Sequence, residues 1–158
     1  MCKTTNQTYS FPEPATAHQV LEKAAEIITE LYLRGELLSS PQAVKDFIQY
    51  KLGGYEREVF AVLYLDNQHR LIAFEEVFYG TIDTATIHPR EVVKGCLNHN
   101  AAAVIFAHNH PSGNATPSDS DRRITQRLKE SLALIDVRAL DHIVAGKDCV
   151  SLAEKGWM

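Results

Sequence analysis

The chain has 158 residues, a formal net charge of −4 and a hydrophobic fraction of 45%, which is the profile of an ordinary globular domain. The acidic balance gives no general attraction to nucleic acid or to anionic membranes, and no segment approaches the length of a membrane span. The cysteines, Cys2, Cys96 and Cys149, lack the spacing of a disulfide framework, and the N-terminus has no apolar signal core. We therefore expect a cytoplasmic protein.

The first part of the chain divides into a polar arm and one amphipathic helix. Residues 1–17 are polar and interrupted by prolines, so we expect a loose arm. Apolar residues at helical spacing then predict a helix over residues 18–34: Val20, Leu21, Ala24, Ile27, Ile28 and Leu31. We assign residues 1–36 to this arm and helix and residues 37–158 to the main domain. The apolar stripe is typical of a core or docking face, and a homodimer contact is one role open to it.

The next segment predicts a helix followed by a hairpin. A helix between Ser40 and Gly53 has a Ser-Pro start and a Gly-Gly stop, and it should bury Val44, Phe47, Ile48 and Leu52. The nearly continuous apolar run over residues 58–65 indicates a strand covered on both faces. A polar turn separates it from a second strand over residues 71–79, and residues 81–87 predict a loop or a short strand.

The second half of the chain alternates helices and strands. The expected elements are a helix from Pro89 to residues 98–100, a buried strand over residues 101–107, a helix with an apolar face of Ile124, Leu128 and Leu132, and closing strands over residues 137–145 and 149–152. The fold class is therefore α/β, a mixed β-sheet layered with helices and preceded by the N-terminal helix.

The stretch after the 101–107 strand holds the candidate chemistry. His108 and His110 are two residues apart, so an extended chain directs both imidazoles to the same side. Neutral imidazole is a common zinc ligand, and the carboxylate of Asp121 can supply a third bond. Three protein ligands leave a fourth position for water, as in catalytic zinc sites. The residues predict a hydrolytic centre with one Zn²⁺ per chain, although a His-x-His pair alone is more often a surface or hydrogen-bonded feature.

Ser118 and Asp121 admit two interpretations. Ser118-x-x-Asp121 fits a capping box at the start of a helix, which needs no metal. Alternatively, Thr116 caps the helix and Pro117 occupies its first position. Ser118 and Asp121 would then share a helix face and be free to turn toward the histidines. We favour the second register.

The same stretch resembles a known motif. His108-x-His110, followed after seven residues by Ser118-x-x-Asp121, resembles the JAMM motif of the MPN (JAB) metalloprotease-like domains. The run His-Asn-His-Pro-Ser-Gly, followed by Pro-Ser and Asp, is similar to the bacterial RadC branch. The similarity runs from about Ser40 to the C-terminus and includes residues 58–60, 65–66, 90–93 and 141–142. RadC proteins generally carry an N-terminal region with helix-hairpin-helix character. That motif is not recognisable in this sequence, so we expect a short form of the family that lacks the helix-hairpin-helix region.

The resemblance implies a fold and an activity. Residues 37–158 would form an MPN domain (JAB/JAMM, cytidine-deaminase-like) that binds zinc through His108, His110 and Asp121. The implied function is a zinc-dependent metallohydrolase that cleaves a peptide or isopeptide (amide) bond of a protein or peptide-like substrate with a zinc-activated water. Ser118 corresponds to the JAMM serine, which is expected to hydrogen-bond the developing oxyanion or the zinc-bound water.

Amide hydrolysis also needs a group that takes and returns protons. The candidate carboxylates are Glu56, Glu58, Glu75, Glu76 and Glu91. We select Glu58 as general base because the JAMM glutamate likewise begins an apolar strand upstream of the histidines, although a solvated strand end is the ordinary role of such a residue. Glu75 is the runner-up. His142, beside Asp141, resembles a family feature with a structural or supporting role.

Other classes of protein fit less well. The alternative hypothesis is a non-enzymatic zinc-containing interaction module associated with DNA repair or mobile-element function, which the naming of the RadC family suggests and the net charge does not support. In HNH nucleases the named residues are spread along a ββα unit, whereas here His-Asn-His is contiguous. A zinc deaminase would need a His-x-Glu and a Cys-x-x-Cys, and the scattered cysteines cannot supply the second.

Overall fold

The structure, a computed structural model, describes residues 10, 14–33, 40–80 and 86–158. The arm expected over residues 1–17 and the loop expected over residues 81–87 lie largely outside these ranges.

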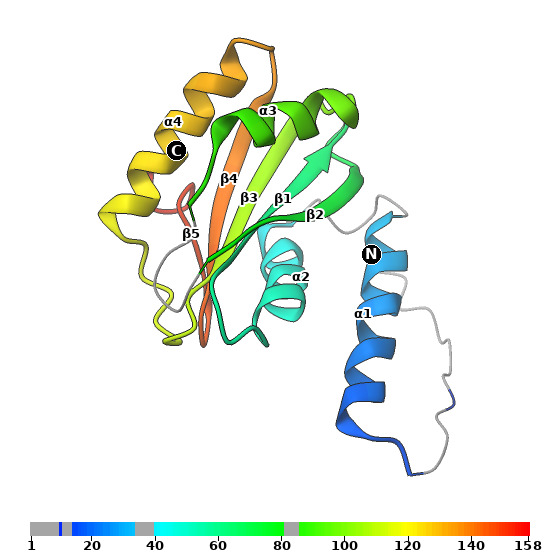
Figure 1. Cartoon of the computed structure of the whole chain (residues 1–158). Helices are drawn as coiled ribbons and strands as arrows, with labels where there is room; N and C mark the ends of the chain where they lie inside the picture. Colours follow the sequence, from blue (N-terminus) through cyan, green and yellow to red (C-terminus); the bar gives the residue numbers. More distant parts are fainter. Residues whose placement is uncertain (1–9, 11–13, 34–39, 81–85) are drawn as a thin grey trace.

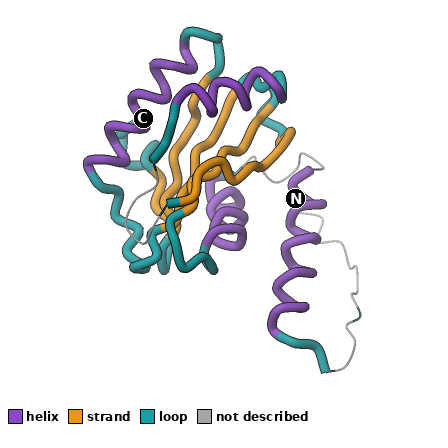
Figure 2. Tube along the Cα trace, viewed as in Figure 1, coloured by secondary structure: helices purple, strands orange, loops and turns teal. Residues whose placement is uncertain are grey.

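One mixed sheet forms the centre of the described part of the chain (Figures 1 and 2). Its strand order is β2-β1-β3-β4-β5, with β3 and β4 parallel and the other neighbours antiparallel. The strands are β1 (Val59–Leu65), β2 (Leu71–Tyr79), β3 (Ala103–Asn109), β4 (Arg138–Ala145) and β5 (Cys149–Ser151). Every residue of β1 and β3 is buried, which confirms that the two apolar runs form strands covered on both faces.

Helices cover both faces of this sheet. On one face lies α2 (Pro41–Leu52), which buries the four predicted residues against β1 and β3: Val44, Phe47, Ile48 and Leu52. On the other face lie α3 (Pro89–Asn98) and α4 (Asp119–Ala133), packed on Phe60, Val62, Val104 and Phe106. Side chains alternate along a strand, so His108 shares the α3 and α4 face with Phe106, whereas Asn109 turns toward α2. The α/β class and the layered mixed sheet are confirmed.

The helix α1 (Ala17–Leu33) stands beside the layered body (Figure 1). The hydroxyl of Tyr50 in α2 donates a hydrogen bond to the carbonyl of Leu21 at 2.8 Å. Val20 and Leu21 of the apolar stripe are 43% and 56% exposed, so this part of the stripe is not core. A homodimer contact through it stays a prediction. Among the helices that the structure describes, none has the length and apolar character needed to cross a membrane.

The start of α4 corrects one prediction, because the cap is Ser118 and not Thr116. The Ser118 hydroxyl accepts a hydrogen bond from the Asp121 amide at 3.1 Å, and the Asp121 carboxylate accepts from the Ser118 amide at 2.6 Å. This capping box satisfies two backbone N–H groups at once. The Thr116 amide instead donates to the side chain of Asn114 at 3.0 Å and belongs to the preceding loop.

Candidate metal centre

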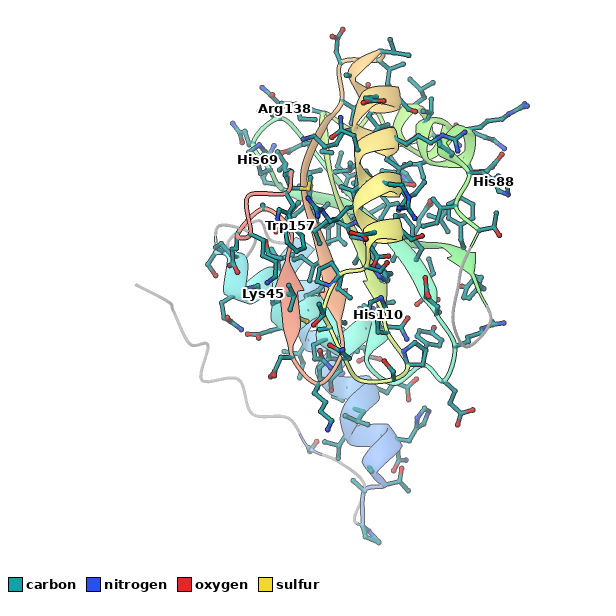
Figure 3. All side chains as sticks on the ribbon, turned by 90° about the vertical axis from the view of Figure 1, so that its left-hand side faces the viewer. Lys45, His69, His88, His110, Arg138 and Trp157 are labelled. Atoms are coloured by element: carbon teal, nitrogen blue, oxygen red, sulfur yellow. The ribbon has the colours of Figure 1, made fainter. Side chains whose placement is uncertain are left out.

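Two histidines and one aspartate converge where β3 ends and α4 begins. The Nε2 atoms of His108 and His110 lie 3.0 Å apart. Asp121 Oδ1 lies 3.3 Å from His108 Nε2, and Asp121 Oδ2 lies 3.5 Å from His110 Nε2. Figure 3 shows His110 at the end of the sheet, below the first turn of α4. The structure thus brings together the three residues that the sequence predicts as ligands.

The local backbone explains this convergence. β3 extends through His108 and Asn109, which pair with Val144 and Ala145 of β4, and the His110 amide continues the pairing by donating to the carbonyl of Ala145 at 2.8 Å. The chain then turns through Gly113, whose φ of +82° favours glycine. This turn returns the chain to the end of the sheet, where the first turn of α4 presents Asp121.

The ring of His110 has a defined orientation. Its Nδ1 lies 2.7 Å from the carbonyl oxygen of Asn114. A carbonyl oxygen can only accept, so Nδ1 carries the hydrogen. In the neutral ring, Nε2 then holds a lone pair directed at the carboxylate of Asp121 and at the other imidazole.

The electrostatics of the cluster favour positive charge at its centre. The hydrogen bond to Asp121 raises the pKa of His110 against the opposing effect of burial, and the charge of Glu58 adds to the rise. Burial works to raise the pKa of Asp121, but hydrogen bonds from the protonated forms of His108 and His110 hold it well below its ordinary value. Converging lone pairs of this kind are stabilised by a proton or by a metal cation.

The donor set and its spacing fit a zinc ion. Two imidazole nitrogens and one carboxylate are common zinc ligands. Tetrahedral bonds of 2.0–2.1 Å place neighbouring ligand atoms roughly 3.3 Å apart, and the separations here are 3.0, 3.3 and 3.5 Å. His108, His110 and Asp121 would therefore hold the ion with little rearrangement.

Glu58 lies beside this cluster. β1 and β3 are antiparallel and pair Phe60 with His108, so continuing the register by two residues places Glu58 opposite His110 on the same face. The Glu58 side chain is buried, with 8% exposure, and its charge contributes to the raised pKa of His110 after the larger effect of Asp121. This position suits a carboxylate that exchanges protons next to the cluster.

Asn109 fixes the backbone on both sides of Glu58. Its side-chain oxygen accepts a hydrogen bond from the Val59 amide at 2.8 Å, and its side-chain nitrogen donates to the Arg57 carbonyl at 3.0 Å. The strand β3, which carries His108, therefore also positions the backbone around Glu58, the residue directly before β1. Sequence reasoning missed this residue, and the available signal was an asparagine at the end of an otherwise apolar strand.

The remaining sequence candidates have definite places. Ser118 donates from its hydroxyl to Asp121 Oδ2 at 2.7 Å, so it contacts the cluster through Asp121. Glu75, the runner-up base, lies 2.8 Å from His99 Nε2, beyond the C-terminal end of α3. His142 is fully buried, with its Nε2 2.8 Å from His108 Nδ1. Burial holds the pKa of His142 well below its ordinary value and so favours the neutral ring.

A pocket of about 200 Å³ borders the cluster on the α2 side of the sheet end. His110 and Asn109 form part of its wall, together with Tyr55 and Lys147.

Comparison with known proteins identifies related sequences. A family model described as the RadC-like JAB domain matches residues 38–157. A UPF0758 protein of Vibrio cholerae serotype O1 is 62% identical over 141 residues, which cover 89% of this chain and 90% of that relative. A UPF0758 protein of Cellvibrio japonicus is 61% identical over 140 residues, which cover 88% of this chain and 62% of that relative. The chain thus spans most of the first relative and less than two thirds of the second.

Proposed function

The chain belongs to the family of RadC-like JAB domains, and from this premise we propose that it is a zinc-dependent hydrolase of peptide or isopeptide bonds. The observation that carries the proposal is the convergence of His108, His110 and Asp121 with the buried carboxylate of Glu58 beside them. JAB domains belong to a superfamily of JAMM metallohydrolases, which agrees with this chemistry. The proposed substrate is a protein or a peptide-like chain.

Each residue has a separate task in this proposal. A zinc ion held by the three ligands would polarise the scissile carbonyl and acidify a water molecule. The Glu58 carboxylate takes a proton from the water that attacks the carbonyl carbon, and it returns this proton to the leaving nitrogen as the C–N bond breaks. The Ser118 hydroxyl, which donates to Asp121 Oδ2 at rest, turns to donate a hydrogen bond to the developing oxyanion.

The size of the ligand set supports hydrolysis over the alternative of an interaction module with structural zinc. Structural zinc sites are closed by four protein ligands, whereas catalytic sites keep one position open. Among the described residues, the group of His, Cys, Asp and Glu side chains able to hold an ion at this point has three members, His108, His110 and Asp121. A three-ligand site leaves the fourth position for the reaction.

The test separates metal binding from proton transfer. Protein purified without chelators should contain about one zinc per chain by elemental analysis. Glu58→Gln keeps the size of the side chain and removes the basic carboxylate, so zinc should remain while turnover of a peptide or isopeptide library falls by about 10²–10⁴-fold. Glu75→Gln is the matched control, because it changes a carboxylate that contacts His99, and it should leave turnover unchanged.

Two results would count against the proposal. If the protein is purified without zinc and also takes up no added zinc, the proposed metal centre is wrong. If Glu75→Gln loses turnover while Glu58→Gln keeps full turnover, the general base is Glu75 and the assignment of Glu58 is wrong.

A further inference from the structure

A chain of buried hydrogen bonds runs beneath the cluster from α4 to β3. The Thr125 hydroxyl donates to the backbone carbonyl of Asp121 at 2.6 Å and lies 2.5 Å from His142 Nδ1. His142 Nε2 in turn lies 2.8 Å from His108 Nδ1. Thr125, His142 and His108 are 1%, 0% and 1% exposed, so water does not compete for these bonds.

The donor and acceptor of each bond follow from chemistry. A threonine hydroxyl has one hydrogen, and the Asp121 carbonyl takes it, so Thr125 Oγ1 can only accept from His142 Nδ1. Because Thr125 Oγ1 accepts from it, His142 Nδ1 carries a hydrogen. In the neutral tautomer with the hydrogen on Nδ1, Nε2 is an acceptor. His108 Nδ1 must then donate to it.

This sequence of bonds decides which nitrogen of His108 is available as a ligand. With its hydrogen on Nδ1, the neutral His108 ring holds a lone pair on Nε2, and Nε2 is the atom that faces His110 and Asp121. We propose that Thr125 is a positioning residue that acts through His142 to hold His108 in the tautomer able to bind the metal. The proposal deepens the proposed function, since it concerns the same metal site.

Without the Thr125 hydroxyl, nothing would hold the hydrogen of His142 on Nδ1, and the hydrogen bond between His142 and His108 could run in either direction. His142 could then carry its hydrogen on Nε2 and donate to His108 Nδ1. The His108 hydrogen would move to Nε2 and block the ligand position. Hydrogen-bond partners of metal-binding histidines typically change metal affinity by about 10–100-fold.

The substitution Thr125→Val removes the hydroxyl and keeps the shape of the side chain. The separate substitution Thr125→Ser keeps the hydroxyl and removes only the methyl group. Ser131→Ala is the matched control, because Ser131 in the same helix also donates to the carbonyl four residues earlier, at 2.8 Å, and takes no part in the histidine chain. Zinc affinity, measured by competition with a chromogenic chelator, should fall by about 10–100-fold in Thr125→Val. It should stay near the wild-type value in Thr125→Ser and Ser131→Ala.

A second readout uses metal-free protein at pH 8. Long-range ¹H–¹⁵N spectra of the imidazole nitrogens should show the Nδ1–H form for both His108 and His142 in the wild type. In Thr125→Val the Nε2–H form should gain population in both rings. If Thr125→Val does not fold, the wild-type and Thr125→Ser spectra still test the assignment.

A wild-type spectrum with His108 in the Nε2–H form would overturn the inference. Unchanged tautomers and unchanged zinc affinity in folded Thr125→Val would overturn it as well. Failure of the wild type to bind zinc, with the tautomers as assigned, would refute the metal-dependent function and leave the hydrogen-bond chain intact.

Discussion

Replacing Asn109 by alanine tests the link between the end of β3 and the backbone on both sides of Glu58. Asn109 is 2% exposed and Val59 is fully buried, so water cannot replace the lost acceptor of the Val59 amide. An unsatisfied buried N–H costs about 1–3 kcal/mol, and the lost bond to the Arg57 carbonyl adds about 0.5–1.5 kcal/mol. We expect the free energy of unfolding to fall by roughly 2–4 kcal/mol.

The assay is urea unfolding of metal-free protein at pH 7, combined with hydrogen exchange of the Val59 amide. The control is Asn114→Ala, because the Asn114 side chain accepts from the Thr116 amide in an exposed loop. Water can replace that bond, so the control should change stability by less than about 0.5 kcal/mol. If Asn109→Ala matches the wild type in stability and Val59 stays protected, the reasoning is wrong.

Three further predictions concern packing, capping and the metal. Gly95→Ala should lower stability by about 1–3 kcal/mol in thermal unfolding, because an added Cβ would lie 2.1 Å from the Tyr64 hydroxyl; an unchanged melting temperature would contradict the packing. Ser118→Ala should cost about 0.5–2 kcal/mol of stability in urea unfolding of metal-free protein while Thr116→Ala costs less, and the reverse order would restore the rejected register. A chelator should lower the melting temperature of zinc-loaded wild type and leave His108→Ala unchanged, and equal shifts in both proteins would argue against His108 as a ligand.

Much of the fold could be predicted from local patterns. The α2 helix has a Ser-Pro start and apolar residues at helical spacing, and its four buried residues match the prediction. The apolar run of β1 and the bounds of β2 were equally clear, because burial on both faces requires unbroken apolar sequence and a polar turn separates the two strands. The three predicted ligands were found together because a strand, a turn and a capped helix follow one another in a short stretch of chain.

Other features depend on contacts distant in sequence. β3 was expected to end at Ala107, but it continues through His108 and Asn109 because these residues pair with Val144 and Ala145 of β4. The role of Thr125 depends on His142, which lies on another strand. No local pattern contains such pairings, so periodicity and propensity could not reveal them.

The correction at the start of α4 has a chemical explanation. Capping and metal binding were treated as competing roles for Asp121, but a carboxylate has two oxygens and several lone pairs. Oδ2 accepts the hydrogen bonds from Ser118, while Oδ1 faces His108 Nε2 at 3.3 Å. The N-terminus of a helix also stabilises negative charge. The capping box therefore holds the Asp121 carboxylate ionised and oriented toward the histidines, so the two roles support each other.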